Sequence, residues 1–419
     1  MIKAIKSLYT VSDNELHPLN GIRALAIIFI LLFHYNTAMV FKGLVKNINP
    51  IVTAVIGNLE SGVDLFFILS GFLISSELYK SWTNKKKNFF KIFFLKRFFR
   101  IVPAYYFYLF IMILFLLFHL AALKSAPLTQ FTISKIKMIE SLLKVTEVDF
   151  CFLGNFIQGN NRHLWSLATE QQFYLLFPFL SYFFLFKQKL NVRLLVLGIS
   201  YLAIMVTRFM LMANFNTGEF DISKELYWIG KTTRFDAILI GIVLMDLFHN
   251  HRDLFTSLKG LRMALIVMTG IIIVIASFLN QLILTARFAN IAKYNLFNIG
   301  FGLLFFATLA GNKILTRFLS LIVFVPIARV SYTMYLWHML TPSLSIAFVG
   351  LSNKPINTAV YLFIFIFYLS VTFIFSSMLY LIIEYPLCRL KNRVVLRYSA
   401  HSTIISGGLT NQEHYTRKQ

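Results

Sequence analysis

The sequence predicts an all-α polytopic membrane protein with about ten transmembrane helices. Of its 419 residues, 58% are hydrophobic and 14% are charged, whereas roughly 25% of the residues of a soluble domain are charged. Apolar stretches long enough to cross a ~30 Å hydrocarbon core recur along the chain. Since only closed backbone hydrogen bonding is stable in lipid, each stretch is expected to form a helix.

The order and orientation of the spans follow from the apolar stretches and the basic residues between them. The second connection carries eight Lys and Arg residues between positions 80 and 100, and the first carries Lys42 and Lys46. Basic residues concentrate in cytoplasmic loops, so the second connection and both termini are predicted to be cytoplasmic. The predicted spans are residues 21–41, 58–79, 101–123, 165–186, 193–213, 226–248, 261–284, 294–311, 325–347 and 357–383.

Charge and cysteine content restrict the partners. The formal charge is +23, but the basic residues lie between apolar spans, which indicates topology and lipid contact rather than nucleic acid. Cys151 and Cys388 have no spacing typical of a metal site, and no disulfide framework or metal is expected. Residues 1–20 are predicted to be a cytoplasmic segment, 21–386 the membrane domain, and 387–419 a basic, partly disordered cytoplasmic tail.

Ionisable side chains inside the predicted spans are the main functional signal, because each costs at least a few kcal/mol in lipid. At ~1.5 Å per residue, His34 lies about 19 Å from the cytoplasmic edge, and Asp64 and Glu170 lie about 9 Å below the outer boundary. The three side chains are therefore expected at one level. An imidazole beside carboxylates suits general-base catalysis on a hydroxyl. The alternative is that such residues simply join helices by hydrogen bonds.

Sequence motifs for other chemistries are missing. Gly230, Lys231 and Thr232 imitate the end of a phosphate-binding loop, but Glu225 occupies the position that requires glycine. The sequence contains neither a G-x-S-x-G elbow nor an H-E-x-x-H pair. A nucleotide-binding loop, a serine-hydrolase site and a zinc-protease site are therefore excluded.

Several long motifs follow one another in a recognisable order. Residues 62–74 read G-V-D-L-F-F-I-L-S-G-F-L-I, after L-N-G-I-R-A at 19–24 and His34. Then come K-R-F-F-R at 96–100, H-L-W-S-L-A-T-E-Q-Q-F-Y at 163–174, T-R-F-D at 233–236, S-Y-T-M-Y-L-W-H at 331–338 and E-Y-P at 384–386. The sequence resembles acyltransferase family 3, the polytopic bacterial membrane O-acyltransferases. That family usually has two glutamates before Q-F-Y, whereas Gln171 replaces the second one here.

The resemblance implies a role for individual residues. It makes His34 the essential histidine, for which Asp64 and Glu170 are the candidate catalytic partners. Arg97 and Arg100 match the R-x-x-R of the family on the predicted cytoplasmic side, where guanidinium groups suit the phosphates of coenzyme A. Arg23 is a candidate for the same donor site. The remaining motif positions are candidates for the substrate pocket: Ser70, Trp165, Ser166, Arg234, Asp236, Tyr332 and His338.

The implied function is a membrane O-acetyltransferase of the bacterial inner membrane. It would use cytoplasmic acetyl-CoA and a hydroxyl of a cell-surface polysaccharide such as lipopolysaccharide O-antigen, or of a lipid-linked sugar. Alternative acceptors are an exopolysaccharide, peptidoglycan or a secreted small molecule, and both direct transfer and a transient acyl-histidine are open. A transporter is the alternative from another class, because ten spans with charges at the midplane would serve it too.

Overall fold

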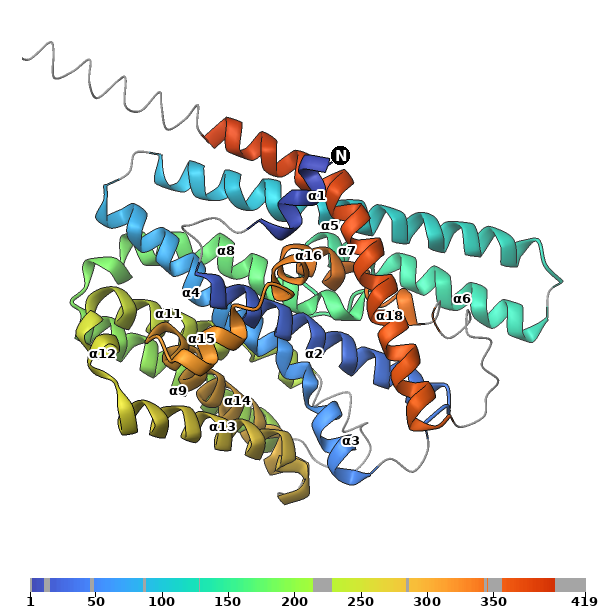
Figure 1. Ribbon diagram of the computed structural model, residues 1–419. Coiled ribbons are helices and arrows are strands. Elements are labelled where there is room, and N and C mark those ends of the chain that lie inside the picture. The colour runs from blue at the N-terminus through green and yellow to red at the C-terminus, as the bar shows by residue number, and fades with distance from the viewer. Residues whose placement is uncertain are drawn as a thin grey trace, which may run out of the picture.

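The computed structural model describes residues 2–10, 16–45, 49–85, 88–127, 129–213, 228–283, 286–342, 345 and 356–395. Within these ranges the regular structure is helical and no strand occurs, which confirms the all-α part of the predicted fold class. The elements, shown in Figure 1, are α1 (Ile2–Tyr9), α2 (His17–Phe41), α3 (Pro50–Gly57), η1 (Leu59–Ser61), α4 (Gly62–Thr83), α5 (Phe89–Lys124), α6 (Gln130–Lys144), α7 (Thr146–Phe150), η2 (Arg162–Leu164), α8 (Trp165–Phe183), η3 (Leu185–Lys187), α9 (Leu190–Ala213), α11 (Asp236–Asn250), α12 (Arg252–Ser257), α13 (Gly260–Ile283), α14 (Ala286–Leu309), α15 (Lys313–Leu319), α16 (Phe324–Trp337), α18 (Thr358–Leu379) and the π-helical turn η4 (Tyr380–Glu384).

Long apolar helices show a multi-pass membrane protein. In the described ranges, six segments are long and apolar enough to cross a membrane: His17–Phe41, Pro50–Thr83, Phe89–Lys124, Leu190–Met212, Gly260–Asn280 and Thr358–Val395. A seventh is present if Ala292–Leu309 and Lys313–Leu319, which are bent by 95°, form one span. The other three predicted spans coincide with α8, α11 and α16, of 19, 15 and 14 residues. The count of ten and the sides of the termini therefore stay predictions.

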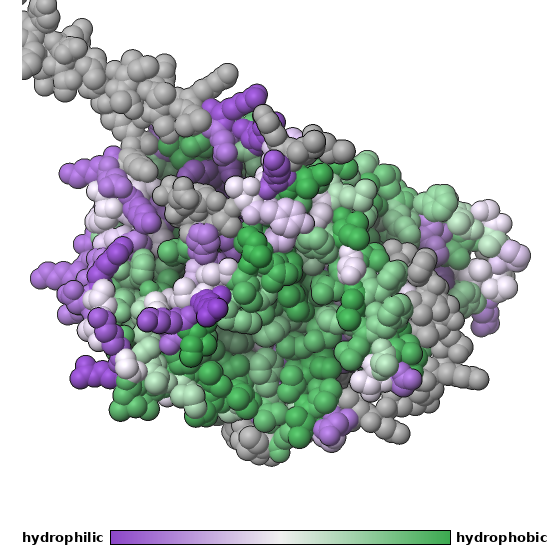
Figure 2. Space-filling model, viewed as in Figure 1, coloured by the Kyte–Doolittle hydropathy of each residue, from purple (hydrophilic) through white to green (hydrophobic). Residues whose placement is uncertain are grey.

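The surface agrees with a lipid environment. Figure 2 shows a broad hydrophobic face across the centre and right of the molecule, with hydrophilic residues gathered along the left margin. Many large apolar side chains are exposed, including Phe118 on α5 and Leu261 on α13. Such a surface would be unfavourable in water and is normal against acyl chains.

Both ends of the predicted membrane domain continue as helix. Residues 2–9 form α1, and α2 begins at His17 rather than at the predicted Gly21. The last helical segment continues to Val395, beyond the predicted end of the domain at 386. The rest of the predicted tail, residues 396–419, lies outside the described residues.

Two predicted spans are interrupted where candidate site residues lie. The stretch 226–248 is broken at residues 233–235, and the stretch 325–347 is broken at residues 338–340. Buried side chains satisfy the carbonyl groups that these breaks release: Arg208 Nη2 donates to Thr233 O at 2.8 Å, and Thr341 Oγ1 donates to His338 O at 3.0 Å. Irregular backbone at membrane depth is stable only when it is satisfied inside the protein in this way.

The helix α2 lies in the middle of the bundle, packed against α4, α15 and α16 (Figure 1). Helix α4 in turn packs closely on α11, where Gly71 and Gly241 face each other. A Cβ on Gly71 would overlap the carbonyl oxygen of Ile238, and one on Gly241 would overlap that of Ile68. Small residues therefore set the distance between these two helices, and α4 and α11 together hold the polar groups beside α2.

Candidate functional site

The helix α2 carries two of the predicted site residues, Arg23 and His34. They are eleven positions apart, which is about 16 Å along a helix. Each belongs to a different group of polar side chains. Arg23 lines a cavity, and His34 lies in a cluster of histidines.

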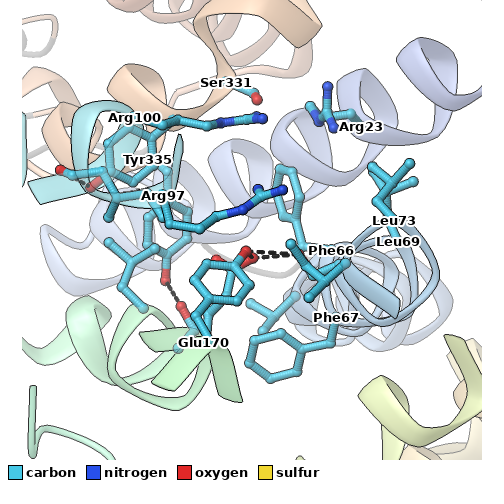
Figure 3. Close-up of a pocket in the computed structure, with 18 residues that line it drawn as sticks. Arg23, Phe66, Phe67, Leu69, Leu73, Arg97, Arg100, Glu170, Ser331 and Tyr335 are labelled. Atoms are coloured by element: carbon cyan, nitrogen blue, oxygen red, sulfur yellow. Dashed lines mark hydrogen bonds between the residues drawn. The ribbon is translucent and has the colours of Figure 1, made fainter. Parts of the chain in front are cut away.

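The cavity beside Arg23 lies between α2, α4, α5, α8 and α16 and has a volume of about 100 Å³. Figure 3 shows the guanidinium groups of Arg23, Arg97 and Arg100 directed toward one space, with Glu170 on its far side. Two separate helices, α2 and α5, thus bring the predicted donor residues together. Seven predicted site residues line this cavity: Arg23, Ser70, Arg97, Arg100, Ser166, Glu170 and Tyr332.

Arg97 is held in place from three directions. Its Nη2 donates to Glu77 Oε2 at 2.6 Å, and its guanidinium lies over the rings of Phe93 and Tyr174 at 5.6 and 5.5 Å. Lys96 binds the other oxygen of Glu77, also at 2.6 Å. The Nε of Arg97 is buried and has no hydrogen-bond partner in the described structure. Arg97 therefore presents an oriented N–H donor whose position Glu77 and two rings fix.

Glu170 lies in the same cavity and accepts hydrogen bonds from the hydroxyls of Ser70 and Tyr174 (Figure 3). The ring that carries one of these hydroxyls also contacts Arg97. Among the described residues, no hydrogen bond joins Glu170 to His34. The structure thus places Glu170 with the predicted donor residues and not at the side of the histidine.

A second cavity adjoins the first, and Arg23, Arg100 and Tyr332 line both. Its volume is about 400 Å³. Its wall adds five basic, acidic or histidine residues from α4, α11, α16 and the last helical segment: Lys80, His249, Arg329, Glu384 and Lys391. Of these, the buried Glu384 lies in the π-helical turn η4 and accepts a hydrogen bond from Thr333. The two cavities together form a cationic entrance.

The histidine cluster contains His34, His163 and His338, contributed by α2, η2 and the residue after α16. The ring centroids of His34 and His338 are 4.8 Å apart, and those of His338 and His163 are 5.2 Å apart. His338 and His163 are buried, whereas His34 remains partly accessible. Of these three residues, His34 is therefore the most accessible.

Tyr335 connects the cavity with this cluster. It lines the cavity, its hydroxyl donates to the carbonyl of His163 at 2.6 Å, and its ring lies 5.5 Å from that of His338. Ser166, another lining residue, is 2.5 Å from the same hydroxyl. A single side chain, Tyr335, thus lies between this cavity and two of the histidines, His163 and His338.

Asp64 and Arg234 belong to a buried network of ion pairs. The guanidinium of Arg234 binds both oxygens of Asp64 at 2.6 and 3.0 Å, and it lies over the rings of Trp165 and Tyr294 at 5.4 and 4.6 Å. Nearby, Glu60 binds Lys293 at 2.7 Å and is 3.9 Å from Arg234. No hydrogen bond joins Asp64 to His34 in the described ranges.

Asp236 has a comparable position at the start of α11. Its carboxylate accepts from Arg208 Nη2 at 2.6 Å, and both side chains are fully buried. Arg208 also donates to Thr233, so this pair stabilises the break that precedes α11. The predicted pocket residues Trp165, Arg234 and Asp236 are therefore in the ion-pair network, outside the cavity wall.

Comparison with known proteins assigns the family. Residues 16–381 match the family model described as an acyltransferase domain, that of acyltransferase family 3. The chain belongs to this family. It is 28% identical over 346 residues to the O-acetyltransferase OatA of Staphylococcus aureus strain NCTC 8325 / PS 47, which covers 80% of this chain and 52% of the relative. It is 25% identical over 384 residues to a putative O-acetyltransferase of strain COL, covering 88% and 56%.

The chain spans about half the length of these curated relatives. No solved structure matches it. The acyltransferase motifs lie within the matched residues, so the geometry described above is that of the family domain in this chain.

Several polar residues of the acyltransferase domain were not predicted as site residues. Glu60 precedes Asp64 by one helical turn, and this i, i+4 spacing was a usable signal. Arg208 lies inside a predicted span and should have been counted with the other intramembrane charges. Glu77 and Lys80 are at the end of α4 among residues that the positive-inside rule explains. His163 was visible in the H-L-W-S motif, but nothing local indicated that it lies next to His34.

Proposed function

We propose that the chain is a membrane O-acetyltransferase that transfers an acetyl group from cytoplasmic acetyl-CoA to a hydroxyl of a cell-surface polysaccharide. The observation that carries this proposal is the pair of cationic cavities, whose lining residue Tyr335 contacts the histidine cluster that contains the partly accessible His34. The names of the relatives support acetyl as the transferred group. Family membership alone supports acyl transfer.

The cationic cavities suit the donor. Coenzyme A carries a diphosphate and a 3′-phosphate, and Arg groups recognise phosphates by charge-assisted hydrogen bonds. Arg23, Arg97 and Arg100 surround the inner cavity, and Lys80 and Lys391 add positive charge to the adjoining one. In this proposal the phosphates bind at these residues, and the thioester points toward Tyr335. The ten spans and the cytoplasmic termini belong to the same proposal, since they place this entrance on the cytoplasmic side.

His34 is the proposed general base. The imidazole takes the proton from the acceptor hydroxyl while that oxygen forms a bond to the thioester carbonyl carbon. The carbon–sulfur bond then breaks, and the proton passes from the imidazolium to the thiolate of coenzyme A. The protons and charges of this reaction balance without a metal ion or a redox partner. Asp64 and Glu170 act in this scheme by holding neighbouring groups in place, since neither is bonded to His34.

The proposed acceptor is a sugar hydroxyl that reaches His34 from the outer side of the bacterial inner membrane. Lipopolysaccharide O-antigen, exopolysaccharide, peptidoglycan, a lipid-linked sugar and a secreted metabolite all carry such hydroxyls. Mass spectrometry of the surface glycans from a deletion strain and from the complemented strain identifies the acceptor through the acetyl groups that are lost and restored.

A direct assay separates the enzyme from a transporter. Purified protein in lipid nanodiscs is supplied with labelled acetyl-CoA and extracts of surface glycan. An enzyme releases coenzyme A and labels the glycan in a reaction that depends on His34. Binding of acetyl-CoA without His34-dependent release of coenzyme A would contradict the proposal.

Neutralising Arg97 and Arg100 together is expected to weaken donor binding. The double variant Arg97→Gln/Arg100→Gln should raise the KM for acetyl-CoA at least tenfold, because hydrogen bonds to charged groups each contribute about 1.5–3 kcal/mol. Insertion should be normal, since Lys96 still pairs with Glu77. Titration of acetyl-CoA in the nanodisc assay measures the change.

The matched control removes two cations that line neither cavity, Lys187 and Lys189. Both are exposed. If Lys187→Gln/Lys189→Gln raises the KM as much as the arginine variant does, the arginines act only through a diffuse positive field.

Glu170→Gln is expected to lower activity on the order of tenfold, because the carboxylate that orders Ser70 and Tyr174 beside Arg97 becomes neutral. The loss should be measured as a higher KM for acetyl-CoA, since Glu170 lies in the donor cavity. Gln171→Glu serves as the neighbouring control and should remain active, because it restores the two glutamates usual in the family. A Glu170→Gln enzyme with an unchanged KM and a large loss of kcat would instead return Glu170 to the role of a partner of His34.

A further inference from the structure

One buried nitrogen of the histidine cluster has no hydrogen-bond partner in the part of the chain that the structure describes. This atom is Nε2 of His338, a residue that is fully buried. The other ring nitrogen, Nδ1, is 2.7 Å from the carbonyl oxygen of Tyr335. A carbonyl only accepts, so Nδ1 carries the proton of the neutral ring and Nε2 is a bare acceptor. A buried acceptor without a donor is unfavourable, and a donor is therefore expected nearby.

The two neighbouring imidazoles differ in what they can donate. His163 Nε2 is 3.2 Å from the carbonyl oxygen of Leu336, so its proton is on Nε2 and its Nδ1 is also a bare acceptor. His163 cannot donate to His338 in this state. His34, with its ring centroid 4.8 Å from that of His338, makes no hydrogen bond to any described residue. Of the two neighbouring imidazoles, His34 is therefore the one whose N–H is available to donate.

We propose that His338 is a positioning residue for His34, and that its Nε2 accepts a hydrogen bond from one ring nitrogen of His34. This inference rests on the proposed function, in which His34 is the general base. A hydrogen bond from one nitrogen fixes the tautomer, so the other nitrogen of His34 is unprotonated and faces the acceptor hydroxyl. His338 thus does for His34 what a carboxylate does in many catalytic dyads.

The surroundings favour this assignment over the predicted carboxylates. Asp64 binds Arg234 through both oxygens, and Glu170 binds Ser70 and Tyr174. The carbonyl oxygens of Tyr335 and Leu336 hold His338 and His163 rigidly, because both belong to the last turn of α16. Glu60 is likewise held by cations, since it binds Lys293 at 2.7 Å and is 3.9 Å from Arg234.

Two substitutions at position 338 separate the proposed acceptor from the contact with Tyr335. His338→Asn places an amide N–H near the position of Nδ1 and removes the acceptor, whereas His338→Gln can place an amide oxygen near the position of Nε2. We expect His338→Asn to lower kcat at least tenfold without a change in the KM for acetyl-CoA, because a misoriented base loses part of the ~10²–10⁴-fold contribution of general-base catalysis. We expect His338→Gln to recover most of that loss.

A double variant tests whether His338 acts through His34. In the His34→Ala background, His338→Asn should not lower the residual rate further, since the group it positions is absent. A normal kcat for His338→Asn, or an equal further loss in the His34→Ala background, overturns the inference. An active His34→Ala enzyme overturns the proposed function itself, whereas an inactive His34→Ala enzyme with an active His338→Asn enzyme overturns the inference alone.

A measurement on the wild-type protein covers the case in which the variants do not fold. Nitrogen-15 labelling of the nine histidines in nanodiscs, with assignment from His34→Gln, reports which ring nitrogens carry protons. The expected result is one protonated nitrogen on His34 coupled across a hydrogen bond to an unprotonated Nε2 on His338. A protonated Nε2 on His338, or no coupling between the two rings, overturns the proposal.

Discussion

His34→Ala is expected to abolish acyl transfer while the protein still inserts in normal amount. His34 is the partly accessible imidazole of the cluster, and its ring lies 4.8 Å from that of His338, which in turn contacts Tyr335 in the cavity wall. General-base catalysis contributes typically 10²–10⁴-fold, so the acetylation that remains should be at least a hundredfold lower. His34→Gln should be as inactive, because an amide cannot take the proton.

Acetylation of the surface glycan, normalised to the amount of protein in the membrane, measures this effect. The control is His119→Ala, since His119 is exposed on α5 and contacts the ring of Phe115. It should leave acetylation unchanged. Near-normal acetylation by His34→Ala at normal abundance would remove His34 from the reaction.

Asp64→Asn is expected to destabilise the fold, in contrast to the effect at His34. The carboxylate of Asp64 is fully buried and binds both Nε and Nη2 of Arg234. Removing one partner of such a pair leaves an uncompensated buried charge, which costs about 3–5 kcal/mol. We expect a lower melting temperature in detergent and less protein in the membrane.

Replacing both partners tests this explanation. Asp64→Leu/Arg234→Met removes both charges, and apolar replacement of a buried pair is often neutral. Glu60 keeps its bond to Lys293 in this variant, so no new isolated charge is created. Stability should return in the double variant, measured as melting temperature and abundance. A stable but inactive Asp64→Asn protein would contradict the structural role and support a catalytic one.

The local sequence was enough to predict the helical membrane fold, the family and many of the polar residues that line the cavity beside Arg23. Apolar stretches alone require helices, because lipid offers no partner for free backbone groups. Arg97 and Arg100 are one turn apart on α5, so their common direction follows from helical periodicity. Seven of the predicted residues line one cavity, and each of them belongs to a motif that lies on a single helix.

The partners of His34 were decided only by tertiary structure. A rise of ~1.5 Å per residue gives the depth of a residue along a helix. It does not give the rotation of α8, which places Glu170 on the side of Arg97. Nor does it show that Asp64 binds the guanidinium of Arg234. The calculation of depth also assumes unbroken helices. However, α11 begins after the break that contains Arg234, and α16 ends at the break that contains His338. The sequence by itself determined which residues are polar within the membrane. Their pairing depended on packing between helices far apart in the chain, since buried charges and ring nitrogens bind whichever partner the bundle brings within reach.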